Sequence, residues 1–480
     1  MDEHEDLKKR LTEGRLSRRE FIKLSVIAGL SGSAVMSALA ACAPTSAPTG
    51  AATVPPTAAP ILPTATPAPV PLSVEGNLTM KLRASFIPQA NEILRATVEQ
   101  WGADNNIPVA VDIVSMNDIQ TITATAAETG AGPDIIELNQ ASAHTYAQVL
   151  ADVSDVAEDL GSRYGGWYNS AIEACKVSNV WRSVPRYYPS HAINYRTDVL
   201  EAIGAGVPAT WEELYEIGKG LKAAGLPQIG FPLGHAVGDG NDFNYSVLWS
   251  YGGSDIASDG ATIAIDSAET REALAFMKKL FDETMPPDTL SYDDSSNNRA
   301  FNAGAISVTN NAASIYINAR NQVIKVQDVN GDERNLSDLM DHFVYPAGPA
   351  GAVTYAEFMS QGIMGYSRNV EAAKALITYL NEREPLMLFA MPNYSFAFPA
   401  LRVYKDDPLM PWNTNPKIAA FKDYAEVSHL PGYPSQNFVG GNDAYVKWVI
   451  VDMFASVCGG MATIDQAIAT AVPLLEESYS

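Results

Sequence analysis

The hydrophobic and polar positions that follow residue 77 predict a series of alternating strands and helices. Over 78–85, apolar and polar residues alternate as they do in a strand with one buried face, and 107–114 is a second strand-like run, rich in Val and Ile. Between these runs, apolar residues recur at helical spacing over 91–104, where Asn91 can cap the helix. The pattern therefore opens with a strand, a helix and a second strand.

The same alternation continues along the chain. We expect a helix over 117–129, a short strand over 134–138 and a helix over 142–150. Further helical patterns follow at 211–224, 269–284, 370–381 and 445–455. Strands that alternate with helices predict the α/β class, with a mostly parallel sheet covered on both faces. Because ligands bind beyond the carboxyl ends of such strands, the loops that end the first and third strands are the expected ligand loops.

The first 41 residues have the parts of an export signal. Arg18 and Arg19, followed by Phe21 and Lys23, resemble a twin-arginine signal. A mildly apolar stretch over 24–41 comes next, and its glycines and small residues make it a poor permanent membrane helix. We therefore expect residues 1–41 to be a signal peptide that is removed after export.

A cysteine and a proline-rich segment follow this signal. Leu39-Ala40-Ala41-Cys42 resembles a bacterial lipobox, in which Cys42 becomes the lipidated residue, and two acyl chains give stable membrane anchoring. The alternative is an ordinary secretory cleavage site with an incidental cysteine. Residues 43–71 are almost only Ala, Pro, Thr, Ser, Gly and Val and carry no charge, which is typical of a disordered tether. The sequence thus predicts an extracytoplasmic domain held to the membrane through a tether over 42–74.

Composition narrows the function classes. With 32 Lys and Arg against 55 Asp and Glu, the net charge of −23 disfavours nucleic acid and anionic lipid surfaces as partners. Cys175 and Cys458 lie at no metal-ligand spacing, and they can form one disulfide or remain two separate thiols. Residues 328–332 resemble part of a calcium loop but lack its glycine and its final acid, so we expect a hairpin turn there. No metal or cofactor site is predicted.

Six short motifs, in order, resemble those of family 1 extracellular solute-binding proteins, among them the maltodextrin-binding proteins. They are Gly132-Pro133-Asp134-Ile135-Ile136 with Tyr146-Ala147-Gln148, Val184-Pro185 with Tyr195, Pro208-Ala209-Thr210-Trp211-Glu212-Glu213-Leu214, and the segments 301–308, 371–376 and 464–468. In the third motif, Thr210 and Glu213 have the spacing of a capping box. The resemblance covers essentially everything after residue 75.

The resemblance implies a type II periplasmic-binding-protein-like fold, with two hinged α/β lobes and the ligand in the cleft between them. It also implies a monomeric binding lipoprotein, without catalytic activity, that delivers a small polar solute to the transmembrane subunits of an ABC permease; a carbohydrate is the expected solute. Motif order assigns 75–188 and 311–357 to one lobe, 192–306 and 362–480 to the other, and hinge crossings near 189–191, 308–310 and 358–361.

Sugar sites combine flat aromatic faces with side chains that form hydrogen bonds to hydroxyl groups. These residue types occur in the segments that the resemblance places at the cleft, and the candidate ligand residues are Asn139, Gln140, Tyr187, Tyr188, Asn241, Asp242, Asn310, Asn311, Tyr394, Phe396, Trp412, Asn442 and Trp448. Each has a purely structural alternative, such as helix capping by Asn139 or core packing of the rings. The chain lacks the aromatic residue and Asp-Arg pair that maltodextrin binders carry after the third strand, so maltodextrin itself is not the expected ligand.

Two other function classes stay open. A glycoside hydrolase would use two of the many carboxylates, although no nucleophile elbow, metalloprotease helix, phosphate loop or dinucleotide fingerprint occurs in the sequence. A surface lipoprotein that senses or scaffolds through protein contacts would use the same anchor, but it would have no need of two hinged lobes.

Overall fold

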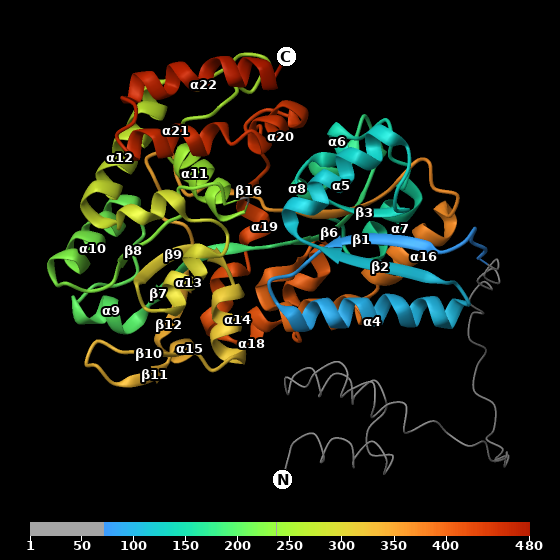
Figure 1. Cartoon of the computed structure of the whole chain (residues 1–480), viewed down its shortest axis with the longest axis horizontal. Coiled ribbons are helices and arrows are strands. Elements are labelled where there is room, and N and C mark those ends of the chain that lie inside the picture. Colours follow the sequence, from blue (N-terminus) through green and yellow to red (C-terminus); the bar gives the residue numbers. More distant parts are fainter. Residues whose placement is uncertain (1–71, 237) are drawn as a thin grey trace, which may run out of the picture.

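The structure, a computed structural model, describes residues 72–236 and 238–480, and it folds them into two α/β lobes side by side (Figure 1). A six-stranded sheet forms the centre of the first lobe and a four-stranded sheet that of the second. The predicted signal peptide with Arg18 and Arg19, the lipidation site Cys42 and the tether up to residue 71 lie outside the described residues. Within the described ranges, no helix is both long enough and apolar enough to cross a membrane.

The sheet of the first lobe has the strand order β15-β6-β14-β3-β1-β2. Its strands are β1 (Leu78–Arg83), β2 (Val109–Val114), β3 (Ile135–Asn139), β6 (Val184–Tyr188), β14 (Met359–Ile363) and β15 (Phe398–Pro399). β1 is parallel to β2 and β3, whereas β14 enters antiparallel between β3 and β6. Only the two pairs of β1 are parallel, as predicted; the pairs of β14 with β3 and β6 and of β15 with β6 are antiparallel, because segments that return from the second lobe join the sheet. The expectation of a mostly parallel sheet is therefore wrong.

Helices cover both faces of this sheet. They are α4 (Pro88–Asn105), α5 (Met116–Thr129), α6 (Ser142–Thr145), α7 (Ser154–Arg163), α8 (Asn169–Cys175), α16 (Val370–Asn381) and α17 (Arg383–Asn393), and a hairpin of β4 (Lys176–Val177) and β5 (Val180–Trp181) lies beside them. α4 begins with a proline, whose fixed φ suits a first helical position, and it ends at Asn106 in the left-handed conformation. The apolar residues of its predicted stripe, including Leu94 and Val98, are buried against the sheet.

The second lobe is built on the sheet order β12-β7-β9-β8. Its strands are β7 (His191–Arg196), β8 (Gln228–Ile229), β9 (Ile306–Ala312) and β12 (Met340–Phe343). Its helices are α9 (Thr197–Ala202), α10 (Trp211–Ala223), α11 (Asp239–Ser250), α12 (Ala268–Thr284), α13 (Ser296–Asn302), α20 (Phe438–Val446), α21 (Val449–Cys458) and α22 (Ile464–Ser478), with a 3-10 turn at Pro287–Ser291. Every residue of α11 is buried, so this helix forms the centre of the lobe.

α10 shows how a local signal sets a helix start. The Thr210 side chain accepts a hydrogen bond from the backbone N–H of Glu213, as a capping box requires. The Glu213 carboxylate accepts its reciprocal bond from the backbone N–H of Ala209, one residue earlier than the motif predicts. The helix start is therefore confirmed.

The other elements of the described residues are short. They are α14 (Ser314–Asn321), β10 (Lys325–Gln327), β11 (Glu333–Asn335), α15 (Leu336–Leu339), β13 (Thr354–Tyr355), α18 (Pro411–Thr414), α19 (Tyr424–Val427), β16 (Ser428–His429) and 3-10 turns at Tyr394–Ala397, Arg402–Asp406 and Pro416–Phe421. Residues 328–332 form the turn of the β10–β11 hairpin, as predicted. Cys175 and Cys458 are free, buried thiols in different lobes, so the disulfide alternative is wrong.

The chain divides between the lobes differently from the division expected from motif order. β12, expected in the first lobe, pairs with β7 in the second, because its partner strand lies there. β14, α16 and α17, expected at a crossing or in the second lobe, belong to the first. The boundaries follow strand pairs that are distant in sequence, and motif order does not encode these pairs.

Two predicted helices also differ from those observed. The helix expected over 142–150 ends at Thr145 and continues as turns. The helix expected over 445–455 is two helices, because Trp448 adopts a left-handed conformation with φ of 61° between α20 and α21. A residue with positive φ cannot continue a right-handed helix.

Candidate functional site

A cavity of about 430 Å³ lies between the lobes. The first lobe contributes α5, the end of β3 and α6, and the second contributes α20 and the end of α22. Beside the cavity the lobes touch, because the rings of His144 in α6 and Phe438 in α20 meet edge to face, 5.1 Å between their centroids. The two lobes are therefore in contact beside the crevice, and we call this arrangement the closed form.

Three buried polar groups on the wall of this cavity have no hydrogen-bond partner in the structure. They are the amide nitrogen Nδ2 of Asn139, the amide oxygen Oδ1 of Asn442 and the hydroxyl of Ser478. Each of these side chains is at least nine-tenths buried. Buried polar groups are almost always hydrogen-bonded, so a cavity wall with a free donor, a free acceptor and a free hydroxyl fits a polar guest.

The partners of these groups also connect the lobes. Asn139 accepts a hydrogen bond from the Ser142 hydroxyl at 3.1 Å, which fixes the orientation of its amide group. The Asn442 amide donates to the Thr145 hydroxyl at 3.4 Å, from the second lobe to the first. Closure therefore brings Asn139 and Asn442 to the same crevice.

The charges around the cavity are mostly acidic. Lys447 is the one basic residue of its lining, and its Nζ is already 2.7 Å from Asp443 and 2.9 Å from Glu477. Glu137 lies at the inner end, where burial raises the pKa of its carboxyl group while nearby Arg186 opposes that rise. An anionic guest would find no unpaired cation on this wall.

At the inner end of the crevice, Gln140 holds an uncommon backbone conformation. Its φ is 48°, in the left-handed region, and its backbone N–H donates to the carbonyl of Phe358 at 2.8 Å. Its side chain is buried and faces Tyr445 of the second lobe. Residues with positive φ cost conformational energy and cluster at functional sites.

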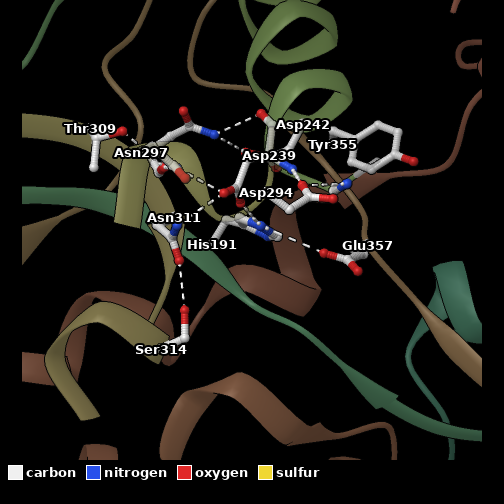
Figure 2. Close-up of polar contacts among 12 residues, drawn as sticks. His191, Asp239, Asp242, Asp294, Asn297, Thr309, Asn311, Ser314, Tyr355 and Glu357 are labelled. Carbon is white, nitrogen blue, oxygen red and sulfur yellow. Dashed lines mark hydrogen bonds and ion pairs between the residues drawn. The ribbon is translucent and has the colours of Figure 1, made fainter. Parts of the chain in front are cut away.

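Next to the crevice, six charged side chains form what we call the hinge cluster: Arg83, His191, Asp239, Asp242, Asp294 and Glu357 (Figure 2 shows all but Arg83). The imidazole Nε2 of His191 lies 3.0 Å from Asp239 Oδ1 and 3.6 Å from Glu357 Oε2. The other Glu357 oxygen is 2.5 Å from the Arg83 guanidinium, and both side chains are nearly inaccessible to solvent.

Amides and a tyrosine complete the cluster. Asn297 and Asn311 donate to Asp239 Oδ2 at 2.8 and 2.9 Å, and the two bonds are visible in Figure 2. Asn310 donates to Asp242 at 3.3 Å, and the Tyr345 hydroxyl donates to the same carboxylate. Figure 2 shows Asn297 and Asn311 converging on Asp239, in the first turn of α11.

The buried charges shift one another's pKa values. Burial lowers the pKa of His191, but the charges of Asp242 and Glu357 and the hydrogen bond to Asp239 outweigh this effect and raise it to about 10. Burial raises the pKa of Asp242 to about 8 against the opposing charge of His191. Burial, together with the charge of Asp239, raises the pKa of Asp294 to about 7.

The structure places the predicted ligand residues in several groups, and as ligand contacts they stay predictions. Asn139 and Asn442 line the cavity, and Gln140 lies behind it. The hinge cluster contains Asp242 and accepts hydrogen bonds from Asn310 and Asn311. Asn241 is buried in the same turn of α11 as Asp242.

The predicted aromatic residues lie outside the cavity lining. The first-lobe core contains Tyr187, Tyr188, Phe396 and Trp412, and Tyr394 is bound to Arg320 at its edge. Trp448 stacks on the His235 ring at 4.6 Å between centroids. For most of these rings the structural alternative therefore describes the observed environment.

Sequence reasoning missed several residues of this region. Ser478 is the last residue of α22, and no motif marks it as a cavity residue. Glu137 precedes the predicted ligand loop by two positions, inside a strand. His191 and Glu357 lie at or next to the expected hinge crossings, so a search for charged residues at the crossings could have found them.

Comparison with known proteins agrees with this architecture. Residues 87–385, more than half of the chain, match the family described as bacterial extracellular solute-binding proteins. Provisionally named binding proteins of Brucella abortus (strain 2308) and Brucella suis biovar 1 (strain 1330) are each 27% identical over 236 residues. That match covers 48% of this chain and 53% of each relative, so the chain spans about half the length of the curated relatives it matches.

Two solved structures share the fold. Maltose-bound MalE3 of T. maritima superposes with a TM-score of 0.70 at 21% identity, covering 83% of this chain and 99% of that one. The GacH receptor of Streptomyces glaucescens GLA.O, solved unliganded and with acarbose and an acarbose homolog, gives a TM-score of 0.67 at 18% identity, covering 84% and 99%. The predicted fold, two α/β lobes of the type II periplasmic-binding-protein kind, is confirmed.

Proposed function

Because the chain belongs to the family of bacterial extracellular solute-binding proteins, we propose that it binds a neutral carbohydrate between its lobes and delivers it, unchanged, to an ABC permease. The observation that carries this proposal is the set of unpaired polar groups on the cavity wall. Asn139 offers a donor from the first lobe, and Asn442 offers an acceptor from the second. A polyhydroxyl solute can satisfy both at once, because each hydroxyl donates and accepts.

The charge of the wall supports a neutral solute over an anionic one. Lys447 is held by two carboxylates, and a phosphate or sugar acid would have to displace one of them. The Glu137 carboxylate at the inner end adds negative charge. The names of the two solved relatives support the sugar assignment, because both were solved with carbohydrate ligands.

The anchor belongs to the same proposal. Export by the twin-arginine signal, acylation of Cys42 and a proline-rich tether would hold the lobes at the outer face of the cytoplasmic membrane. There the solute-loaded, closed form would meet the permease, whose transmembrane and ATPase subunits are separate chains. The protein would act as a monomer.

A thermal-shift screen tests the ligand class. We expect a neutral mono- or oligosaccharide to raise the melting temperature, since a ligand at 100 times its Kd stabilises the folded state by about 2.7 kcal/mol. Sugar acids and glycerol phosphates of matched size serve as controls and should give no shift. If no small solute shifts the transition while a protein partner does, the protein is a sensing or scaffolding lipoprotein instead.

Substitution of Cys42 tests the anchor. We expect Cys42→Ala to move the protein from the membrane fraction to the soluble fraction, because the substitution removes the acylated thiol. Cell fractionation and the mass of the mature N-terminus would report this, with Cys175→Ala as the matched control because Cys175 is buried in the first lobe. Retention of the Cys42→Ala protein on membranes would contradict lipidation at this residue.

A further inference from the structure

Three of the segments that connect the lobes meet at one residue. The first crossing ends at His191, the second lies at the end of β9, which contains Asn311, and the third contains Glu357 between β13 and β14. Asp239, the first residue of α11, binds His191 at 3.0 Å and Asn311 at 2.9 Å. His191 in turn lies 3.6 Å from Glu357, so Asp239 is linked to all three crossings (Figure 2).

This junction is tightly packed and involves both lobes. A Cβ atom added at Gly238 would lie 2.8 Å from Glu357 Oε2, so the start of α11 presses directly on the third crossing. From the first lobe, Arg83 binds the other oxygen of Glu357. A hinge rotation that separates the lobes must therefore change the contacts of this cluster.

The cluster holds more acid than base. It contains four carboxyl groups, from Asp239, Asp242, Asp294 and Glu357, but only two basic side chains, those of Arg83 and His191. Asp242 is fully buried, and its Oδ1 atom has no hydrogen-bond partner in the structure. A surplus of buried negative charge is costly, and proton binding relieves it.

We propose that the hinge cluster is a proton-binding latch, which takes up protons when the lobes close and releases them when the lobes open. The closed form then weakens as the pH rises. If the chain binds solute between its lobes, as proposed above, its affinity for solute also falls as the pH rises. The latch requires that water reaches the cluster in the open form.

The direction of the effect follows from the groups that face His191. These are Asp239 and Asp242 from α11, Glu357 from the third crossing and Tyr424 from α19, whose ring centroid lies 6.1 Å away. Asp294, from the segment before α13, accepts a hydrogen bond from the backbone N–H of Asp239, and Arg83 from β1 binds Glu357. The acids that face His191 outweigh the effect of burial and raise its pKa to about 10 in the closed form. In a hydrated, open cluster we expect its pKa to return toward about 6.5.

At a pH between these two pKa values, His191 is protonated in the closed form and neutral in the open form. The contribution of His191 to closure is therefore complete below its open-form pKa and is lost as the pH rises through about 10. Asp242 and Asp294, whose closed-form pKa values are raised to about 8 and about 7, act with the same sign in a lower range. For each proton taken up, the ratio of closed to open molecules falls by up to about tenfold per pH unit.

Fluorescence energy transfer across the crevice tests the latch without any solute. Labels on Glu128→Cys in α5 and Glu476→Cys in α22, both exposed and on opposite lobes, would report closure in the full-length chain in detergent. We expect the high-transfer population to fall between pH 6 and pH 10. In His191→Gln and in Asp242→Asn this fall should be shallower than in the parent, because each substitution removes one titrating group from the cluster.

His235→Gln is the matched control, because the pair of His235 and Asp452 is exposed and lies outside the cluster. This variant should keep the parent pH profile. A transfer distribution that does not depend on pH, or a His191→Gln and an Asp242→Asn profile that both equal the parent profile, would overturn the latch. Failure of every sugar in the thermal screen would leave these measurements unaffected, so the latch and the solute can fail separately.

Discussion

Glu357→Gln is expected to lower the free energy of unfolding by about 3–5 kcal/mol, the usual cost of removing one partner from a buried ion pair. The Arg83 guanidinium and the Glu357 carboxylate lie 2.5 Å apart, and their side chains are 3% and 2% exposed. Water therefore cannot solvate the Arg83 charge that the substitution leaves without its partner. Urea denaturation at pH 7 would measure the change. The effect should extend to the hinge, because Glu357 also faces His191.

Two further variants make this result specific. Arg271→Met breaks pairs with Asp266 and Asp465 that are open to solvent, and we expect it to change stability little. The double variant Arg83→Met with Glu357→Met should recover part of the loss, because it removes both charges of the pair together. If Glu357→Gln cost no more than Arg271→Met, the buried pair would not stabilise the junction of the lobes.

Asn139→Leu and Asn442→Leu are each expected to weaken solute binding by about 1–3 kcal/mol, or roughly 5- to 150-fold in Kd. Each substitution removes a cavity group that has no other partner in the structure, and leaves a polar group of the solute unsatisfied. Titration calorimetry with the sugar identified by the thermal screen would measure the loss.

Asn105→Leu provides the control for these two variants. Asn105 ends α4, is exposed and lies outside the cavity lining, so its replacement by the same apolar residue should leave Kd unchanged. Equal affinities in all three variants would show that the solute binds somewhere else.

The sequence predicts those parts of the fold that depend on neighbouring residues. The stripe of α4 and the cap of α10 are local, and both helices lie within a few residues of their predicted ranges. β14 is different, because its partners β3 and β6 lie far from it in sequence and no periodicity records such a pair. Motif order predicts a hinge crossing at these residues, and this error also misplaces the boundaries of the lobes.

The candidate site divides in the same way. The sequence predicts Asn139 as a ligand residue because it directly follows the expected strand over 134–138, where ligand loops begin. Ser478 reaches the cavity only because α22 packs on α20 and the lobes close, which depends on tertiary structure. The aromatic residues are harder to assign from the sequence. An interior ring and a ligand-stacking ring have the same residue type, and only packing distinguishes them.

A crystal structure of the protein with the sugar found in the thermal screen tests the central claim most directly. We predict density for the sugar in the interlobe cavity, with hydroxyl groups within hydrogen-bond distance of Asn139 Nδ2 and Asn442 Oδ1. Sugar density outside this cavity, or contacts with only one lobe, would contradict the account.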